Sequence, residues 1–280
     1  MADPLLSLPL YQVTFAVLDV ETTGLYPALG DAICEVAVLR GCDGRVLSQY
    51  HQLVDPGRPI SPEAYAVNRI GSDLLRGAPT FDRIADQVLA ALEGAAVVAH
   101  NAPFDLSFLV AALEECGRPI PHNPVVDTLA LARHCYGFPS NSLPAVAGRL
   151  GVLTPHRHRA LGDARMTWRV LEFFIQDLQS RWGIFTLGEL IRAQGGPIPW
   201  PQTFPRERLP QVLAEALERR RPLVLRYCSS EGQVTERTVE PLRVGNYQGA
   251  VYLVARCLLR GEQRTFRLDR ILEMRLHDLI

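Results

Sequence analysis

The chain has 280 residues, of which 48% are hydrophobic, and its formal net charge is −1. This length is enough for one or two domains with full hydrophobic cores. No stretch reaches the roughly 18 apolar residues of a membrane helix, and the N-terminal residues MADPLLSLPL lack the basic start of a signal peptide, so we expect a cytoplasmic protein with no membrane partner. The six cysteines form no C-x-x-C pair, which argues against a zinc site and a disulfide framework.

The charges are distributed unevenly along the chain. Residues 1–180 hold 13 arginines and 19 acidic residues, whereas residues 181–280 hold 16 arginines and 11 acidic residues, and the chain contains no lysine. Guanidinium groups suit phosphate geometry, so the pattern fits an acidic metal-binding part joined to a basic module. A GC-rich genome would also explain the missing lysine, but it would not explain the asymmetry.

Hydrophobic patterning predicts a strand-rich start followed by alternating helices and strands. This order is typical of an α/β fold in which a mixed sheet is flanked by helices. The expected strands cover residues 11–20, 33–40, 45–54, 95–100 and the start of 124–137. The expected helices cover residues 61–70, 81–92, 101–117, the rest of 124–137, and 160–178.

The segment QGGPIPWPQTFP, residues 194–205, breaks every periodicity and is typical of an interdomain linker. One helix and a run of short alternating strands follow it, which predicts a small, mostly β barrel or sandwich. We therefore expect a first domain over residues 1–180, a helical extension and linker over 181–206, and a second domain over 207–280. The strands of the second domain are expected at residues 222–229, 234–245, 250–258 and 264–271.

The stretch AVLDVETTGL, residues 16–25, places two carboxylates inside an otherwise apolar strand. Asp19 and Glu21 are two positions apart, so both side chains lie on one face of the strand. Two like charges in an apolar setting raise each other's pKa and oppose folding unless a cation neutralises them. The pair therefore indicates a cation site.

Two later segments supply further titratable groups. Asp105 lies in the first turn of the helix that follows the short strand in AHNAPFDLSFL, and His158 precedes Asp163 by five residues in HRHRALGDARM. Taken singly, each aspartate could be a helix N-terminal charge that stabilises by about 0.3 to 1 kcal/mol. The two carboxylates of Asp19 and Glu21 on one strand face shift the interpretation toward one shared metal site.

These three segments, LDVETTGL, AHNAPFDLSFL and HRALGDA, resemble the exonuclease segments of the DEDDh 3′-to-5′ exonucleases, a family that includes proofreading subunits of bacterial DNA polymerases. The resemblance covers about residues 15–174 and implies an RNase H-like fold. It also implies that two ions, Mg²⁺ or Mn²⁺, are held by four carboxylates, and that His158 acts as the general base. The implied catalytic residues are Asp19, Glu21, Asp105, His158 and Asp163.

The resemblance also implies a pocket for the terminal nucleotide. It assigns this role to Thr22, Thr23, Leu25, Asn101 and Phe104, with Leu25 wedged beside a base; ordinary core packing is the alternative for Leu25 and Phe104. Close relatives have a histidine where this chain has Asn68, which cannot stack as a ring does. Asp127 is interpreted as a strand-end or helix-cap residue and not as a metal ligand.

The C-terminal strands resemble a WYL domain, most clearly in RTVEPLRV and RTFRLDRI. The naming triplet reads Val251, Tyr252, Leu253, so its first residue departs from the pattern. The resemblance implies a small Sm-like or SH3-like barrel that binds nucleic acid or a regulatory ligand; a solvated charged face around a buried Tyr252 is the alternative. The candidate binding residues are Arg237, Arg243, Tyr252, Arg264 and Arg267.

Together these features predict a metal-dependent 3′-to-5′ exonuclease that releases nucleoside 5′-monophosphates from single-stranded ends. The expected partners are single-stranded nucleic acid, with DNA favoured over RNA, and a polymerase or repair protein. One alternative is an exoribonuclease or oligonucleotide-clearing enzyme, because the catalytic residues do not distinguish the sugars. A non-catalytic WYL regulator with a dead nuclease scaffold is another, against which the intact catalytic set argues.

Overall fold

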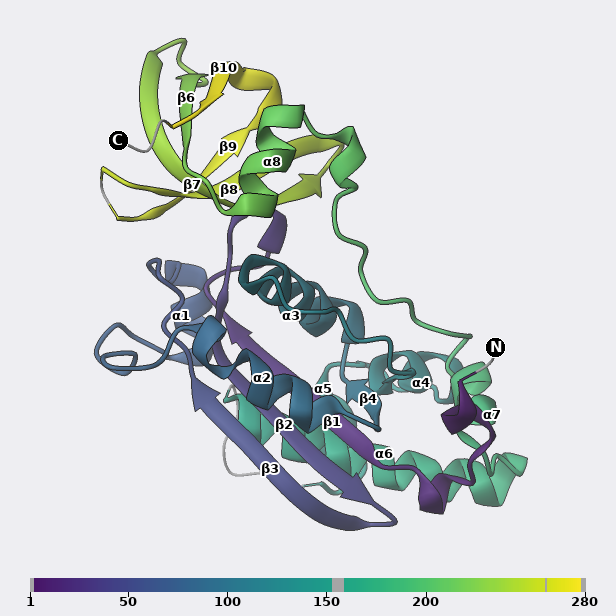
Figure 1. Ribbon diagram of the computed structural model, residues 1–280. Coiled ribbons are helices and arrows are strands. Elements are labelled where there is room, and N and C mark those ends of the chain that lie inside the picture. Colours follow the sequence, from purple (N-terminus) through teal and green to yellow (C-terminus); the bar gives the residue numbers. More distant parts are fainter. Residues whose placement is uncertain (1–2, 153–158, 260, 278–280) are drawn as a thin grey trace.

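The computed structural model describes residues 3–152, 159–259 and 261–277. Within these residues the chain forms two five-stranded sheets, one in each half (Figure 1). The first sheet is mixed, with the strand order β3-β2-β1-β4-β5, and the second is antiparallel, with the order β10-β6-β7-β8-β9. None of the described helices has the length and apolar character needed to cross a membrane.

The first sheet is built around one central strand, β1 (Phe15–Thr22). It pairs antiparallel with β2 (Ile33–Cys42), which pairs with β3 (Arg45–Leu53), and it pairs parallel with β4 (Ala96–Ala99), which pairs with β5 (Val125–Asp127). Because β1, β4 and β5 are parallel, their carboxyl ends meet at one edge, where α/β folds commonly bind ligands. The expected mixed sheet flanked by helices is confirmed.

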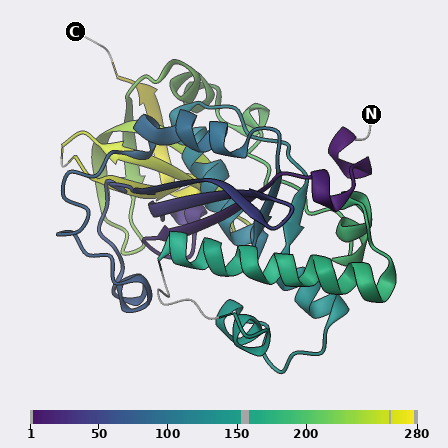
Figure 2. The ribbon, with the colours of Figure 1, turned by 90° about the horizontal axis from the view of Figure 1, so that it is seen from below.

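Helices cover both faces of this sheet. On one face, helices α2 (Phe81–Leu92) and α3 (Ala102–Cys116) pack on alternate residues of β1, and α1 (Pro62–Asn68) lies nearby. On the other face, the long α6 crosses the sheet (Figure 2). The helices of this second face are α4 (Thr128–Cys135), α5 (Leu143–Arg149), α6 (Ala160–Trp182) and α7 (Leu187–Ala193).

The alternation of β1 decides where its carboxylates go. Leu18 and Val20 belong to the core under α2 and α3, whereas Phe15 and Val17 belong to the core under α6. Since side chains alternate along a strand, Asp19 and Glu21 share the face of α6. Burial on both faces also explains why β1 and β2 are apolar almost throughout.

Several boundaries differ from the expectation. The first strand begins at Phe15, because Leu10–Gln12 forms a short 3-10 helix, η2, after another, η1 (Pro4–Ser7). Helix α5 was not predicted. Helix α7, which begins with a capping box between Thr186 and Glu189, lies within residues 181–206, where a helical extension and linker were expected. Helix α6 continues to Trp182 and ends at Gly183, whose φ is 66°.

The linker is anchored to the first domain over part of its length. The Gln194 side chain accepts a hydrogen bond from the Asp127 N–H (2.8 Å) and donates to the Val125 carbonyl (3.0 Å). The Trp200 indole donates to the Asn123 carbonyl at 2.9 Å. Residues 194–200 therefore lie along the β5 edge of the first sheet and do not form a free tether.

The second domain packs helix α8 (Gln211–Arg219) against its antiparallel sheet. The expected strand over residues 264–271 is divided in two: β9 ends at Arg267, and the short helix η5 (Leu268–Arg270) turns the chain into β10. The other elements of this half are η4 (Arg206–Arg208), β6 (Leu223–Cys228), β7 (Val234–Tyr247), β8 (Ala250–Cys257), β9 (Gln263–Arg267) and β10 (Ile271–Leu276).

Candidate active site

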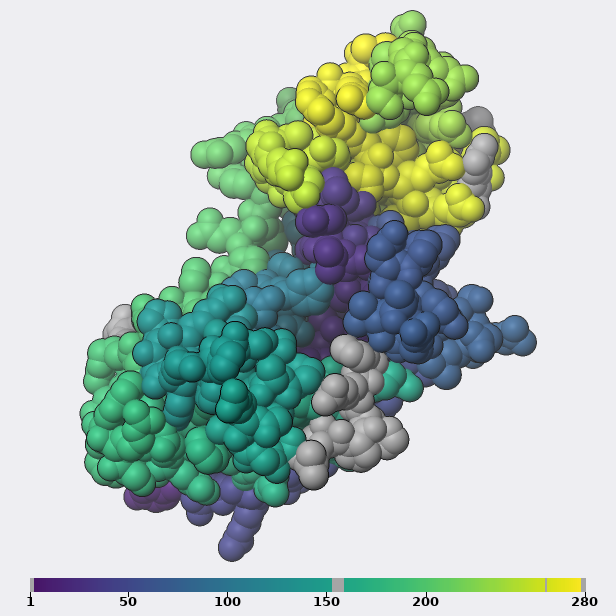
Figure 3. All heavy atoms as spheres, turned by 180° about the vertical axis from the view of Figure 1, so that it is seen from behind, coloured from purple at the N-terminus to yellow at the C-terminus, as the bar shows by residue number. Residues whose placement is uncertain are grey.

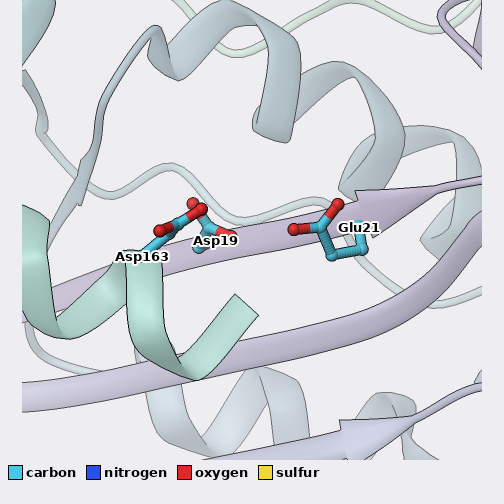
Figure 4. A group of neighbouring side chains, drawn as sticks. All are labelled: Asp19, Glu21 and Asp163. Atoms are coloured by element: carbon cyan, nitrogen blue, oxygen red, sulfur yellow. The ribbon is translucent and has the colours of Figure 1, made fainter. Parts of the chain in front are cut away.

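Three carboxylates converge between β1 and the first turn of α6. Asp19 and Glu21 come from β1 and Asp163 comes from α6, and one carboxylate oxygen of each lies within 4.8 Å of the others (Figure 4). Residues 144 positions apart in the sequence thus meet because α6 crosses the sheet on the face that carries the strand pair. Asp163 therefore lies beside Asp19 and Glu21.

Burial and repulsion from neighbouring acids hold Asp19 and Glu21 toward their protonated forms. The pKa of Asp19 lies well above its ordinary value, first because the carboxyl is buried and then because Asp105, Asp163 and Glu21 are close. Burial, with Asp163 and Glu35, raises the pKa of Glu21 to about 8, partly offset by Asn68 and Arg159. A site that disfavours its own negative charge in this way favours a bound cation.

Asp105 is fixed to the same strand by its own hydrogen bond. It lies in the first turn of α3, is 5% exposed, and its Oδ1 accepts the Val20 N–H at 3.0 Å. Burial raises its pKa, although the bond from Val20 lowers it. Its charge also raises the pKa of Asp19, so Asp105 contributes to the field of the cluster and ties α3 to β1.

A fifth acid, Glu35, was not among the predicted site residues. It is fully buried on β2, directly opposite Glu21 in the register. Arg159 donates to both of its oxygens, at 3.1 Å from Nε and 2.7 Å from Nη2, and His51 Nε2 lies 2.6 Å from Oε1. The Ala160 N–H, at the start of α6, donates to Glu35 at 3.0 Å.

This network compensates the Glu35 charge and fixes the start of α6. Burial alone would raise the pKa of Glu35, but the bonds from Arg159, Ala160 and His51 lower it below its ordinary value. Glu35 is therefore ionised, paired and unavailable as a ligand in this arrangement. A lone glutamate inside the apolar run AICEVAVL was the sequence signal for it.

Of the predicted pocket residues, Thr22 ends β1, whereas Thr23 and Leu25 lie in the loop of residues 23–32. We call this loop the substrate loop, because it carries predicted pocket residues. The Thr22 hydroxyl donates to the Gly24 carbonyl at 2.6 Å, and Thr23 Oγ1 accepts the Ala32 N–H at 3.0 Å. Both threonines are buried, whereas Leu25 is 65% exposed beside them. The alternative for Leu25, ordinary core packing, is thereby removed.

The remaining pocket candidates lie at the start of α3. Asn101 is exposed, with a φ of 77°, and its N–H donates to Asp127 at 2.9 Å. The Phe104 ring packs on Phe108 at 5.0 Å between centroids and is half-buried. Asp127 is the N-cap of α4 and accepts the Leu129 N–H at 2.8 Å, which confirms its interpretation as a helix cap.

Asn68 is buried beside the carboxylates and serves the backbone. Its amide donates to the Thr22 carbonyl at 3.3 Å, and its Oδ1 accepts the Ile70 N–H at 3.0 Å. It thus holds the end of β1 against α1. His158, the predicted general base, lies outside the described residues.

The five C-terminal candidates are placed differently from one another. Tyr252 and Arg267 line one hollow of about 520 Å³ with Tyr247, and Arg267 forms a two-point ion pair with Asp269 at 2.7 and 2.8 Å. Arg264 lies 3.8 Å from Glu262, and Arg237 lies on β7. Arg243 departs from the expectation. It is 3% exposed and its guanidinium contacts the first domain, so a nucleic-acid strand bound at the surface has no access to it.

Comparison with known proteins identifies both halves. Residues 16–171, more than half of the chain, match the RNase_T family, described as Exonuclease. The chain belongs to this exonuclease family. Residues 208–276 match the WYL domain. The resemblance of the first half to DEDDh exonucleases and of the second half to WYL domains is confirmed.

Curated relatives share the first domain. The DNA polymerase III subunit epsilon-like protein of Rhodobacter capsulatus is 38% identical over 188 residues, covering 65% of this chain and 26% of the relative. The PolC-type DNA polymerase III of Thermotoga petrophila is 36% identical over 177 residues, covering 63% of this chain and 13% of the relative. The chain therefore spans about a quarter or less of the length of these relatives.

Solved structures show the same fold. Escherichia coli Exonuclease I in complex with a dT13 oligonucleotide gives a TM-score of 0.56 at 19% identity, covering 87% of this chain and 55% of that one. The nuclease domain of 3′hExo, a DEDDh family member bound to rAMP, gives 0.53 at 17% identity, covering 61% and 95%. The first likeness extends beyond the residues that match the exonuclease family.

The donor set fits hard divalent cations. Carboxylate oxygens are the ligands that Mg²⁺ and Mn²⁺ prefer, and the described residues around the cluster bring together acids whose pKa values are raised by one another. Asp19, Glu21 and Asp163 would hold the ions, and Asp105 would contribute the oxygen that does not accept the Val20 N–H.

The raised pKa of Glu21 predicts an unusual pH dependence of stability. Unfolded glutamate has a pKa near 4.5, and the folded value is about 8, so between these values the folded state binds more protons and stability falls as pH rises. In EDTA the melting temperature should fall by about 5 °C or more from pH 6 to pH 8, and Mn²⁺ should reverse the fall.

Glu21→Gln should flatten this dependence in EDTA, whereas Glu93→Gln, at an exposed position of the same domain, should keep it. Calorimetry at several pH values makes the comparison. A metal-free protein that gains stability up to pH 8 would contradict the assignment of a repelling cluster.

Proposed function

We propose that this protein is a metal-dependent 3′-to-5′ exonuclease that releases nucleoside 5′-monophosphates from single-stranded DNA. The observation that carries the proposal is the convergence of Asp19, Glu21 and Asp163 within 4.8 Å in an exonuclease-family domain. The names of the relatives, which are DNA polymerase III proteins, support DNA as the substrate and a polymerase as partner. The dT13 oligonucleotide on Exonuclease I supports a single strand.

The chain's own residues prepare the site for phosphodiester hydrolysis. When bound, divalent cations would supply Lewis-acid stabilisation of the phosphoryl oxygens and lower the pKa of the attacking water. The carboxylates are held in place by two fixed attachments: Glu35 holds the start of α6 and hence Asp163, and Asp105 holds β1 through Val20. Such rigidity keeps reacting groups in one geometry, which is a large part of catalysis.

His158 is proposed to take the proton of the attacking water. It has an unperturbed pKa near 6.5 as a residue type, so the neutral base is available at neutral pH. Its neighbour Arg159 is fixed by Glu35. Thr22, Thr23, Leu25, Asn101 and Phe104 are proposed to line the pocket of the terminal nucleotide.

The WYL domain is proposed to hold the single strand upstream of the terminus. Tyr247 and Tyr252 lie with Arg267 around one hollow, and aromatic faces with arginines are the usual means of binding single strands without sequence preference. Tyr26 of the substrate loop lies against Tyr247, with 4.8 Å between ring centroids. The aromatic residues of the two domains are therefore adjacent.

The deciding experiment is an assay of DNA and RNA oligonucleotides labelled at either end. We expect single nucleotides to be released from the 3′ end with Mg²⁺ or Mn²⁺ and no turnover in EDTA. Asp163→Asn should lower kcat by at least about 10³-fold, since it removes a metal ligand. Asp177→Asn, on the same helix but paired with Arg181, should keep wild-type activity.

Activity in EDTA, or release from the 5′ end, would overturn the proposal. A preference for RNA ends would instead establish the exoribonuclease alternative. Full-length protein with no turnover on any of these substrates, but with ligand binding by the WYL domain, would establish the non-catalytic regulator.

His158→Ala tests the general base. It should lower kcat by about 10² to 10⁴-fold with little change in KM, and the acidic limb of the pH profile, which reports protonation of the base, should flatten. His134→Ala, at a histidine whose Nδ1 pairs with a carbonyl of its own helix, should keep the wild-type profile. An unchanged acidic limb in His158→Ala would assign the proton to another group.

Arginine substitutions test the binding role of the WYL domain. Each arginine that contacts a phosphate adds roughly 0.7 to the slope of log K against log salt for single strands. Arg264→Ala and Arg267→Ala should each reduce that slope for oligo(dT) binding by full-length protein. Arg219→Ala, which breaks an exposed ion pair with Glu215 on α8, should leave the slope unchanged. Equal slopes in all variants would favour a domain that senses a ligand or a partner protein.

A further inference from the structure

We propose that Arg243 and Thr265 of the WYL domain are positioning residues of the nuclease site, because they hold the substrate loop in its place. The inference rests on the proposed exonuclease function. It differs from the binding role above: there the WYL domain contacts the strand, whereas here it contacts the exonuclease domain and shapes the terminal-nucleotide pocket.

Two side chains of the WYL domain form hydrogen bonds to backbone carbonyls in the middle of the substrate loop. Residues Pro27–Leu29 form a short 3-10 helix, η3. The Thr265 hydroxyl donates to the Leu29 carbonyl at 2.7 Å, and Arg243 Nη2 donates to the Pro27 carbonyl. These two bonds satisfy carbonyls at both ends of η3, so they fix its orientation as well as its position.

Arg243 is itself held from the exonuclease domain. Its Nε donates to Glu115, near the end of α3, at 2.6 Å, and Gln263 Nε2 lies 3.5 Å from the same oxygen. The arginine is 3% exposed. Without Glu115 the buried guanidinium would lose the carboxylate that compensates its charge. Because Arg243 bonds to Glu115 on α3 and to Pro27 on η3, it fixes the positions of both elements together.

The substrate loop is also packed closely against the strands of the WYL domain. In the space-filling view, a purple part of the first domain lies directly against the yellow-green strands of the second (Figure 3). Gly245 on β7 lies under Ala28: a Cβ on Gly245 would come within 2.9 Å of the Ala28 Cα and Cβ. Any side chain at this position would therefore push η3 away from the sheet.

At its base, next to the end of β1, the loop is closed by hydrogen bonds between its own residues. The Thr23 N–H donates to the Ala32 carbonyl at 2.9 Å, and Asp31 accepts the Tyr26 N–H at 3.0 Å. Leu25 stands between these two attachments with its side chain exposed. Its position relative to Glu21 is thus set by β1 on one side and by the WYL domain on the other.

This arrangement removes a conformational cost from substrate binding. A free loop of this length would have to be ordered each time a nucleotide binds, and this loss of conformational freedom opposes binding. A loop held in its bound position does not incur that cost, which lowers KM without any contact between the holding residue and the substrate.

Two substrates separate this role from strand binding. The p-nitrophenyl ester of thymidine 5′-monophosphate occupies the terminal pocket alone, whereas oligo(dT) of about 20 nucleotides also reaches a binding surface outside it. Thr265→Val keeps the shape of the side chain and removes its hydrogen bond, which is worth about 3- to 10-fold. We expect it to raise KM by that factor for both substrates, with kcat changed less than about 2-fold.

Further variants give matched comparisons. Gly245→Ala should raise KM for both substrates, because it displaces η3 without removing a bond. Arg267→Ala should raise KM for oligo(dT) alone. Arg256→Ala, on the same sheet but 3.7 Å from Glu240 of its own domain, should leave both KM values unchanged.

Hydrogen exchange of residues 23–32 supplies a readout that needs no turnover. Exchange in this segment should be faster in Thr265→Val and Gly245→Ala than in wild type and Arg256→Ala. An active wild type with unchanged KM for the ester in both loop variants, or unchanged exchange in them, would overturn the inference. A wild type that hydrolyses neither substrate would refute the proposed function, and the exchange comparison would still decide the inference.

Discussion

The repulsion between buried carboxylates is the constraint on which the rest of this structure depends. Asp19, Glu21 and Asp163 share a few ångströms, and burial and like charge raise the pKa values of the strand pair. A loosely packed protein would relieve that repulsion by letting the groups separate. This chain prevents it by placing two of them on the central strand of a sheet covered on both faces, and the third on a long helix that is packed along one of those faces. The energy that would drive the carboxylates apart is available instead for binding cations.

Glu35 shows how a fold can place one more acid beside this cluster and compensate part of its charge, although Glu35 still helps to raise the pKa values of Asp19 and Glu21. It lies opposite Glu21, where an unpaired carboxylate would increase the repulsion. Arg159, His51 and the Ala160 N–H supply bonds that lower its pKa. Removing one partner from such a buried pair is costly because the remaining charge is left in a poor environment. The same bonds attach α6 to β2, so the group that compensates Glu35 also determines where Asp163 lies.

The sequence predicted those parts of the site that depend on local pattern. Asp19 and Glu21 stand two apart in an apolar strand, and Asp105 and Asp163 stand in first turns of helices, so their chemistry could be recognised without tertiary information. The mixed sheet followed from the order of strands and helices. Glu35 and Arg243 could not be assigned in this way, because their roles are set by partners 124 and 128 residues distant. Arg243 resembled a phosphate-binding arginine on a strand face, and only the packing of that face on the first domain buries it and gives it Glu115 and the Pro27 carbonyl as partners. Helix α5 is seven residues long and carries too little periodicity to be separated from a loop.

The contacts between the domains indicate that the WYL domain is attached rigidly and is not a module on a flexible tether. A tethered module acts through effective concentration, and a flexible linker would serve it. Here residues 194–200 are bound to the edge of the first sheet, and the WYL domain contacts the exonuclease domain at the loop that follows the catalytic strand. A tethered module does not need such a rigid connection. A domain that holds the substrate loop in place does need one, because the loop can be fixed only by a surface that does not itself move relative to the first domain. The substrate loop, with one end on β1 and its middle on β7 and β9, therefore belongs structurally to both domains.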